Sequence, residues 1–282
     1  MINNEQQVND KKNAAYVAEK LRLLRTVIRG KSSLLVAFSG GLDSSVIAKV
    51  AYEELGDKAI AVTIASDTFS QRELEMAQNT AKEIGIRHVV EKMSELENDE
   101  FVKNPVDRCY HCKKEEMVVM KKVAAKLGME DIAFGVNISD FGEHRPGIKA
   151  LNEEGFFQPL VEAGIGKDIM NGVAKLLGLS NYNMPSTTCL ASRIPYGQII
   201  TGHKLHQIER AEAALYALGF HQSRVRHYGE MARIEVDENE IEKVVAHRQT
   251  IVNGLKELGF VYVTLDLVGY RSGSMNEILP TL

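Results

Sequence analysis

The chain has 282 residues, a net charge of −4, 44% hydrophobic and 26% charged residues. This length has room for one large or two modest domains, and the composition is that of a globular protein. The mild acidity disfavours a nucleic-acid partner. No apolar run approaches the roughly 20 residues of a membrane span, and the polar start Met1–Glu5 lacks a signal-peptide core, so we expect a cytoplasmic protein that does not bind membranes.

Strand-like and helix-like segments alternate through the first two thirds of the chain. A leading helix is predicted over residues 14–28, and further helical stripes at 74–84, 117–127 and 166–177. The strand-like runs are Leu34–Phe38, Ala59–Ile64, His88–Glu91 and Asp131–Val136. This alternation predicts an α/β fold, a parallel sheet flanked by helices, with ligands bound beyond the carboxyl ends of the strands.

A dense turn of glycines and hydroxyls follows the first strand: Ser39-Gly40-Gly41-Leu42-Asp43-Ser44-Ser45. Its free backbone N–H groups and the helix N-terminus behind it suit a multiply charged anion, and Asp43 suits Mg²⁺. An ordinary capped glycine turn is the simpler alternative, but it needs fewer of these residues. Neither G-x-x-x-x-G-K-[ST] nor G-x-G-x-x-G occurs, which removes the signatures of Walker and Rossmann sites.

The turn resembles the SGGxDS pyrophosphate loop of the N-type ATP pyrophosphatases, which include GMP synthetase, NAD synthetase, asparagine synthetase and the tRNA thiolases. The resemblance implies an adenine nucleotide alpha hydrolase-like domain that splits ATP between its α and β phosphates and passes AMP to a substrate oxygen. We expect adenine beside Ala61 and Thr63 of the second strand. The phosphates and Mg²⁺ are expected on Ser39, Gly40, Gly41, Asp43, Ser44 and Ser45.

The chain has three cysteines, Cys109 and Cys112 in a C-x-x-C between the third and fourth strands and Cys189 much later. Three thiols bind zinc with His111 or another ligand, or hold a [4Fe–4S] cluster by three of its irons. Alternatively, Cys109 and Cys112 are an inert pair or a redox dithiol, and Cys189 is an ordinary buried cysteine. The spacing alone leaves these alternatives open.

The pattern changes after a loop-rich linker, Pro185–Gly202. The remaining pattern predicts a smaller α/β domain. It begins with a helix that contains Leu205 and Leu218, followed by a strand pair around Gly229. A helix to Gly254, begun by a capping box of Asp237 with Glu240, and a last strand complete it. We divide the chain into an ATP pyrophosphatase domain, residues 1–184, and a linker with a substrate-binding or oligomerisation domain, residues 185–282.

Arginines mark the second domain. Arg224 and Arg226 alternate along one predicted strand, project to one face, and are spaced to clamp a phosphate or carboxylate. Ser192 and Arg193 of the linker are expected to join them. A solvated basic strand face is the alternative.

The run Cys189-Leu190-Ala191-Ser192-Arg193-Ile194-Pro195-Tyr196-Gly197 resembles the signature of the LarE family of pyrophosphate-loop sulfur transferases. The resemblance extends over nearly the whole chain, and it adds Arg72, Gly135 and Asn137 to the expected nucleotide contacts. Its further motifs are Asp140, Arg145-Pro146-Gly147, Arg224-Val225-Arg226-His227 and Ala232-Arg233-Ile234-Glu235-Val236.

The resemblance implies that ATP activates the two carboxylates of pyridinium-3,5-biscarboxylic acid mononucleotide and that sulfur replaces one oxygen of each, in the biosynthesis of the nickel-pincer nucleotide of lactate racemase. Family members with three cysteines imply a [4Fe–4S] cluster on Cys109, Cys112 and Cys189 that carries sulfide. Members with one cysteine imply instead that Cys189 gives up its own sulfur. A tRNA thiolase of the same superfamily is the other alternative. The family also implies a homo-oligomer.

Overall fold

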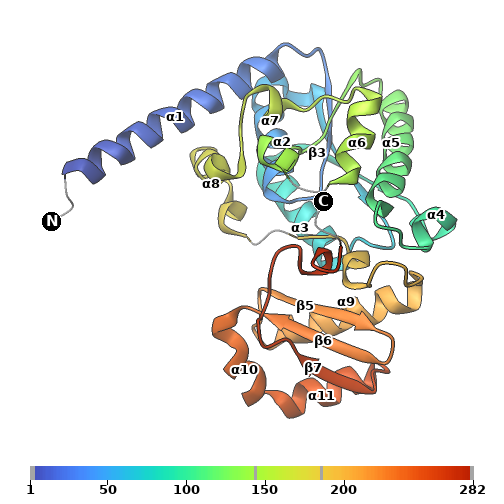
Figure 1. Ribbon diagram of the computed structural model, residues 1–282. Helices are drawn as coiled ribbons and strands as arrows, with labels where there is room; N and C mark the ends of the chain where they lie inside the picture. Colours follow the sequence, from blue (N-terminus) through green and yellow to red (C-terminus); the bar gives the residue numbers. More distant parts are fainter. Residues whose placement is uncertain (1–3, 143–144, 185–186, 280–282) are drawn as a thin grey trace. The chain divides into compact units, whose positions relative to one another are not determined.

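The computed structural model describes residues 4–142, 145–184 and 187–279, so Pro185 and Ser186 of the predicted linker lie outside the described residues (Figure 1). The chain forms two compact units. The first comprises Met1–Met93 and Asp107–Thr187, and the second comprises Ser94–Val106 and Thr188–Leu282. The segment Ser94–Val106 therefore belongs with the C-terminal part of the chain, although it lies between two elements of the first unit.

The first unit is built on a four-stranded parallel sheet with the strand order β3-β2-β1-β4. Its strands are β1 (Leu34–Ala37), β2 (Ala59–Ala65), β3 (Arg87–Lys92) and β4 (Asp131–Ala133). Strand β1 lies between β2 and β4, and Leu34, Leu35 and Val36 are fully buried there. Each of the four predicted strand-like runs overlaps an observed strand, and the central strand β1 is buried on both faces.

Helices cover both faces of this sheet, which confirms the predicted α/β fold (Figure 1). Leu34 and Val36 pack with α1 (Asn4–Arg29), α2 (Leu42–Leu55), α3 (Gln71–Ile84), α7 (Pro159–Glu162) and α8 (Lys167–Leu176). Leu35 packs on the opposite face with α5 (Arg108–Leu127) and α6 (Pro146–Glu154). Successive strand residues point to opposite faces, so each helix layer covers one set of side chains.

Two boundaries differ from the sequence prediction in ways that affect the site. Strand β4 ends at Ala133, and the chain then turns, with the Phe134 N–H bonded to the Phe157 carbonyl at 3.0 Å. Helix α5 begins at Arg108, well before the predicted stripe, so Cys109 and Cys112 lie in a helix. The first turns of α5 are mostly polar and carry no apolar stripe that would predict them.

The second unit contains a three-stranded mixed sheet in the order β5-β6-β7, with β5 antiparallel and β7 parallel to β6. Its helices and strands are α4 (Asp99–Val102), α9 (Gly202–Ala217), β5 (Ser223–Tyr228), β6 (Met231–Val236), α10 (Ile241–Ala246), α11 (Arg248–Glu257) and β7 (Tyr262–Leu265). Short 3₁₀ turns are η2 (Glu95–Glu97), η5 (Leu190–Arg193), η6 (Glu238–Glu240) and η7 (Ser274–Asn276). Its core packs α9 and α11 on the sheet around Phe220 and Leu255.

The predicted capping box at Asp237 is wrong. The Asp237 carboxylate accepts a hydrogen bond from the Asn239 N–H at 3.1 Å and starts the 3₁₀ turn η6. The predicted single helix is two helices, α10 and α11, separated at His247. Asp side chains bond readily to a backbone N–H two residues on, and this turn competes with a helix cap.

None of the helices in the described part of the chain is both long enough and apolar enough to cross a membrane.

Each unit holds a histidine that is shielded from water, His88 partly buried and His227 fully buried. His88 on β3 bonds through Nε2 to the Thr63 hydroxyl at 2.7 Å, and His227 on β5 bonds through Nε2 to Gln207 Oε1 at 3.1 Å. Burial lowers the pKa of both imidazoles from the ordinary value of 6.5. Both rings are therefore held in the neutral form, because desolvation disfavours the charged form.

Acid should destabilise the protein through these two rings. The pKa of each is lower in the folded state, so the unfolded state binds more protons, and the free energy of unfolding falls as the pH drops below about 6.5. Between about pH 7.5 and about pH 5.5, the free energy of unfolding should fall less in His227→Gln than in the wild type. Urea unfolding at the two pH values measures it. His206→Gln, at an exposed position, is the control. Equal losses in His227→Gln and the wild type would contradict the assignment.

Candidate active site

The glycine- and serine-rich loop lies at the carboxyl end of β1 and leads directly into α2. The Ser44 hydroxyl organises it: Oγ accepts from the Ser39 N–H at 3.3 Å, donates to the Gly41 carbonyl at 3.0 Å and lies 3.2 Å from Ser39 Oγ. These short-range bonds close the loop around the helix N-terminus. The first turn of α2 is thereby presented at the sheet edge, where anions bind in parallel α/β sheets.

Gly40 lets this loop lie directly against α3. Its φ is +72°, and a Cβ at this position would lie 2.6 Å from Ala77 Cα. No side chain fits such a gap, and L-residues rarely adopt that φ. The backbone of the loop is therefore held against a helix as well as by the bonds of the Ser44 hydroxyl.

Asn181, in the 3₁₀ turn η4 (Ser180–Asn183), holds the same loop through its side chain. Its Nδ2 donates to the Gly40 carbonyl at 3.1 Å and to Ser45 Oγ at 3.0 Å, and the residue is almost fully buried. The sequence analysis missed Asn181. Its separation from the loop along the chain left no local signal.

The chain after β4 brings Gly135 and Asn137 to Asp43. Asn137 Nδ2 donates to Asp43 Oδ2 at 2.8 Å. A Cβ on Gly135 would lie 3.2 Å from the Ser44 backbone nitrogen, so a glycine gives the passing chain room beside the loop. Strands β1 and β4 are neighbours, and this adjacency places the two motifs together.

A second buried carboxylate, Asp140, lies beside this pair in the 3₁₀ turn η3 (Ile138–Gly142). Its Oδ2 accepts from the Asn137 N–H at 3.1 Å, and its Oδ1 lies 3.2 Å from Arg145 Nη2 and 3.4 Å from Lys167 Nζ. Lys167, at the start of α8, was not predicted. Two carboxylates facing two cations form a polar group suited to Mg²⁺ and phosphate oxygens.

This environment raises the pKa of Asp43. Burial is the largest cause, the Asn137 hydrogen bond opposes it, and the negative charge of Asp140 adds to it, while Lys167 and Arg145 lower the pKa. A metal ion or a phosphate-bound cation at this place would favour the ionised form.

A hollow of about 410 Å³ adjoins Asp140, between η3 and α6. Its lining includes Phe141, Arg145 and Lys149. The carboxylates of Asp140 and Glu153 also line it, so its wall carries charges of both signs.

The other predicted nucleotide contacts lie on β2 and α3. Ala61 is fully buried in the core, and the buried Thr63 donates its hydroxyl to the Phe38 carbonyl at 2.6 Å. The side chains of both residues face the interior of the unit. Arg72 is exposed in the first turn of α3.

The cysteines fall in different units. Cys109 and Cys112 are three residues apart in the first turns of α5, and so lie on one side of the helix, with Cys109 exposed and Cys112 half-buried. Cys189 is half-buried and directly precedes η5 in the second unit. Within neither unit do the described His, Cys, Asp and Glu side chains form a group of three that could hold a metal ion.

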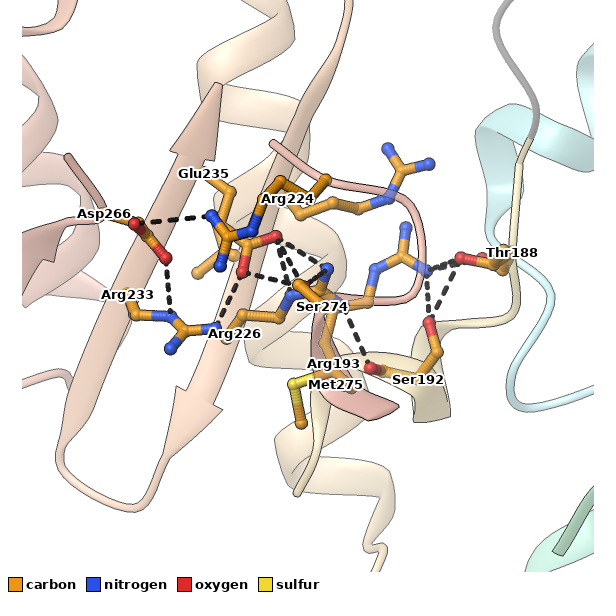
Figure 2. A network of polar contacts seen from close by, with 12 residues as sticks. Thr188, Ser192, Arg193, Arg224, Arg226, Arg233, Glu235, Asp266, Ser274 and Met275 are labelled. Atoms are coloured by element: carbon orange, nitrogen blue, oxygen red, sulfur yellow. Dashed lines mark hydrogen bonds and ion pairs between the residues drawn. The ribbon is translucent and has the colours of Figure 1, made fainter. Parts of the chain in front are cut away.

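Arg193 binds the chain around Cys189 (Figure 2). Its guanidinium is buried and pairs with both Glu212 carboxylate oxygens, at 2.9 and 3.0 Å. Its Nη1 donates to the Thr188 and Cys189 carbonyls, at 2.6 and 2.9 Å, and to Ser192 Oγ at 2.9 Å. Glu212 of α9 thus orients Arg193, and Arg193 fixes the turn that follows Cys189.

Arg226 is also engaged inside the unit. It bonds to Glu235 Oε2 at 2.6 Å, to the Ser192 carbonyl at 3.0 Å and to the Ser274 hydroxyl at 2.9 Å. Figure 2 shows Arg226, Arg233 and Ser274 gathered on the fully buried Glu235.

Arg224, on the same face of β5, lies with its guanidinium 5.2 Å from the Tyr270 ring and donates to the Ser223 carbonyl at 2.8 Å. Burial lowers its pKa, and the nearby charge of Arg193 lowers it further. A bound anion would relieve this crowding of positive charge.

The parallel sheet, the loop after its first strand and the group around Asp43 define the first unit as a pyrophosphate-loop ATP pyrophosphatase domain. The asparagine synthase family profile matches residues 22–111, which include the loop. A chain of the glutamine-hydrolyzing GMP synthase of Pyrococcus abyssi is 28% identical over 176 residues, 58% of this chain and 56% of that relative.

Two relatives match almost end to end. An uncharacterized protein of Synechocystis, slr1717, is 41% identical over 262 residues, 92% of this chain and 98% of the relative. The pyridinium-3,5-bisthiocarboxylic acid mononucleotide synthase of Lactiplantibacillus plantarum is 35% identical over 266 residues, 94% of this chain and 96% of that enzyme. The chain therefore belongs to the LarE family, and it is an ATP-dependent sulfur-transferring enzyme.

Arg226→Ala should destabilise the second unit. The change removes the charge paired with Glu235, whose side chain is fully buried, and we expect a loss of about 3 kcal/mol, the lower end for a broken buried pair, because Arg233 and Ser274 still bind Glu235. Urea unfolding measures it. Tyr262→Ala, exposed on β7, is the control, and an equal loss in both variants would contradict a special role for the pair.

Proposed function

We propose that the enzyme adenylates the carboxylates of pyridinium-3,5-biscarboxylic acid mononucleotide and converts them to thiocarboxylates for the nickel-pincer nucleotide. The observation that carries this proposal is the group of Asp43, Asn137 and Asp140 with Lys167 beside the pyrophosphate loop. The 35% identity with the Lactiplantibacillus plantarum synthase supports the choice of substrate.

In the first step, ATP lies with its phosphates on Ser39–Ser45 and its adenine near the end of β2, and Arg72 contributes from α3. Asp43 and Asp140 would hold Mg²⁺, which would reduce the repulsion between the phosphates and an incoming carboxylate. A substrate carboxylate oxygen attacks the α-phosphorus, the bond to the β-phosphate oxygen breaks, and pyrophosphate leaves. Lys167 is placed to stabilise the charge that develops on pyrophosphate.

In the second step, sulfide attacks the carbonyl carbon of the acyl-adenylate, and AMP leaves with the electron pair of the broken C–O bond. Cys109, Cys112 and Cys189 would hold a [4Fe–4S] cluster, which would supply an iron that binds the sulfide. The i, i+3 spacing of two exposed or half-buried thiols on one helix fits two of its ligands.

The substrate's phosphate is proposed to bind Arg224 together with Ser192, Arg193 and Arg226. Glu212 and Glu235 hold the last two guanidiniums in fixed orientations, so they lose little side-chain entropy when an anion binds. We further propose a cytoplasmic homo-oligomer.

Asp43→Asn tests the adenylation step. It keeps an oxygen that accepts from Asn137 but removes the charge, so we expect pyrophosphate release to fall at least about 100-fold with little change in unfolding free energy. Pyrophosphate release and urea unfolding are measured together. Asp57→Asn, exposed in η1 (Gly56–Lys58), is the matched control. If Asp43→Asn releases pyrophosphate at the normal rate, the proposal that ATP binds at this loop is wrong.

The fate of Cys189 tests the sulfur source. If sulfide comes from a cluster, Cys189 stays intact over many turnovers, and changing any one of the three cysteines to Ala removes the iron–sulfur absorbance together with activity. If Cys189 is the donor, each chain acts once and loses the mass of hydrogen sulfide as dehydroalanine forms. We expect an intact Cys189 by mass spectrometry after turnover, and dehydroalanine at this position would overturn the cluster mechanism.

A further inference from the structure

The segment Ser94–Val106 contains a residue with an uncommon backbone conformation. Asn104 follows α4, and in the described part of the chain it is the only non-glycine residue with positive φ, at +55°. Its N–H bonds to the Phe101 carbonyl at 2.9 Å and closes the end of the helix. Asn tolerates this conformation better than most residues, but a terminal turn alone does not require burial of its side chain.

The Asn104 side chain is fully buried and donates to a loop distant in sequence. Its Nδ2 lies 3.2 Å from the Ile194 carbonyl, 2.8 Å from the Pro195 carbonyl and 3.1 Å from the Gln198 carbonyl. Its own carbonyl accepts from the Gly197 N–H at 2.8 Å. Asn104 thus bonds to the turn at 195–198 through both its side-chain amide and its backbone carbonyl, in addition to the turn's own bond from the Gln198 N–H to the Pro195 carbonyl at 3.1 Å.

This turn continues without interruption from the 3₁₀ turn that follows Cys189. The Ile194 N–H bonds to the Ala191 carbonyl at 3.1 Å, and the Ser192 N–H to the Cys189 carbonyl at 3.0 Å. Arg193 fixes the beginning of this stretch through the Cys189 carbonyl. Asn104 fixes its end, so the Cys189 segment is held at one end by its own buried Arg193, paired with Glu212 of α9, and at the other by a buried side chain from the Ser94–Val106 segment.

We infer that Asn104 is a positioning residue for Cys189: its amide holds the loop after the cysteine and thereby sets where the thiol lies. This inference rests on the proposed role of Cys189 in sulfur transfer. Asn suits the position because it combines an amide donor with tolerance of positive φ. Asp would set a carboxylate against three carbonyl oxygens, and Gly would keep the backbone but supply no donor.

Asn104→Gly and Asn104→Asp in the full-length chain separate these effects. The main readout is alkylation of metal-free protein by iodoacetamide, with each cysteine quantified by peptide mass spectrometry and Cys109 as the internal reference. We expect the Cys189 to Cys109 ratio to rise about tenfold in both variants, because loss of the amide bonds lets the loop open more often. Sulfur transfer should fall about tenfold while ATP–pyrophosphate exchange is unchanged.

Asn98→Ala is the matched control. Asn98 lies in the same segment and caps α4 by accepting from the Glu100 and Phe101 N–H groups. An unchanged alkylation ratio in the Asn104 variants, or an equal rise in Asn98→Ala, would overturn the inference. If the wild type transfers no sulfur, the proposed function fails, but the alkylation ratio still decides the role of Asn104.

Discussion

The active site depends on the contact between the Gly40 backbone and α3. The loop after β1 can display its N–H groups at the sheet edge only if it lies flat against Ala77, and the 2.6 Å gap leaves no room for a side chain. Asn181 holds the other side of the loop through the Gly40 carbonyl. With the loop held from both sides, the residues proposed to bind phosphate would need little reordering when ATP enters.

The charges beside the loop are balanced before any ligand binds. Asp140 is close enough to disfavour the ionised form of Asp43, while Arg145 and Lys167 offset that repulsion. Burial makes these interactions stronger than they would be in water. Such a group is costly for a purely structural role, and under the proposed function it would give a nucleotide and its metal ion a preorganised set of partners.

The second unit uses buried ion pairs to hold a short, irregular segment. The turn η5 has few backbone bonds of its own, yet Arg193 ties it to Glu212 and Arg226 ties the Ser192 carbonyl to Glu235. Buried pairs of this kind add little net stability compared with an apolar core, but they orient their partners strictly. A fixed orientation is what the proposed roles of this segment require, because Cys189 and the side chains proposed to bind phosphate must face their ligands.

Sequence and tertiary structure determined different parts of this molecule. The strands, the loop at Ser39–Ser45 and its approach to Asn137 were predictable, because apolar runs and glycine turns are local signals and parallel strands share one edge. The family was recognisable from its motifs.

Contacts between distant residues were not predictable. Alternation on β5 placed Arg224 and Arg226 on one face, but only the fold decided that Arg226 meets a buried carboxylate on β6. Lys167, Asn181 and Asn104 act through partners far along the chain, and their identities carry no local pattern. Local physics selects the elements, whereas the partner of a buried polar side chain is decided by which segments the fold packs together.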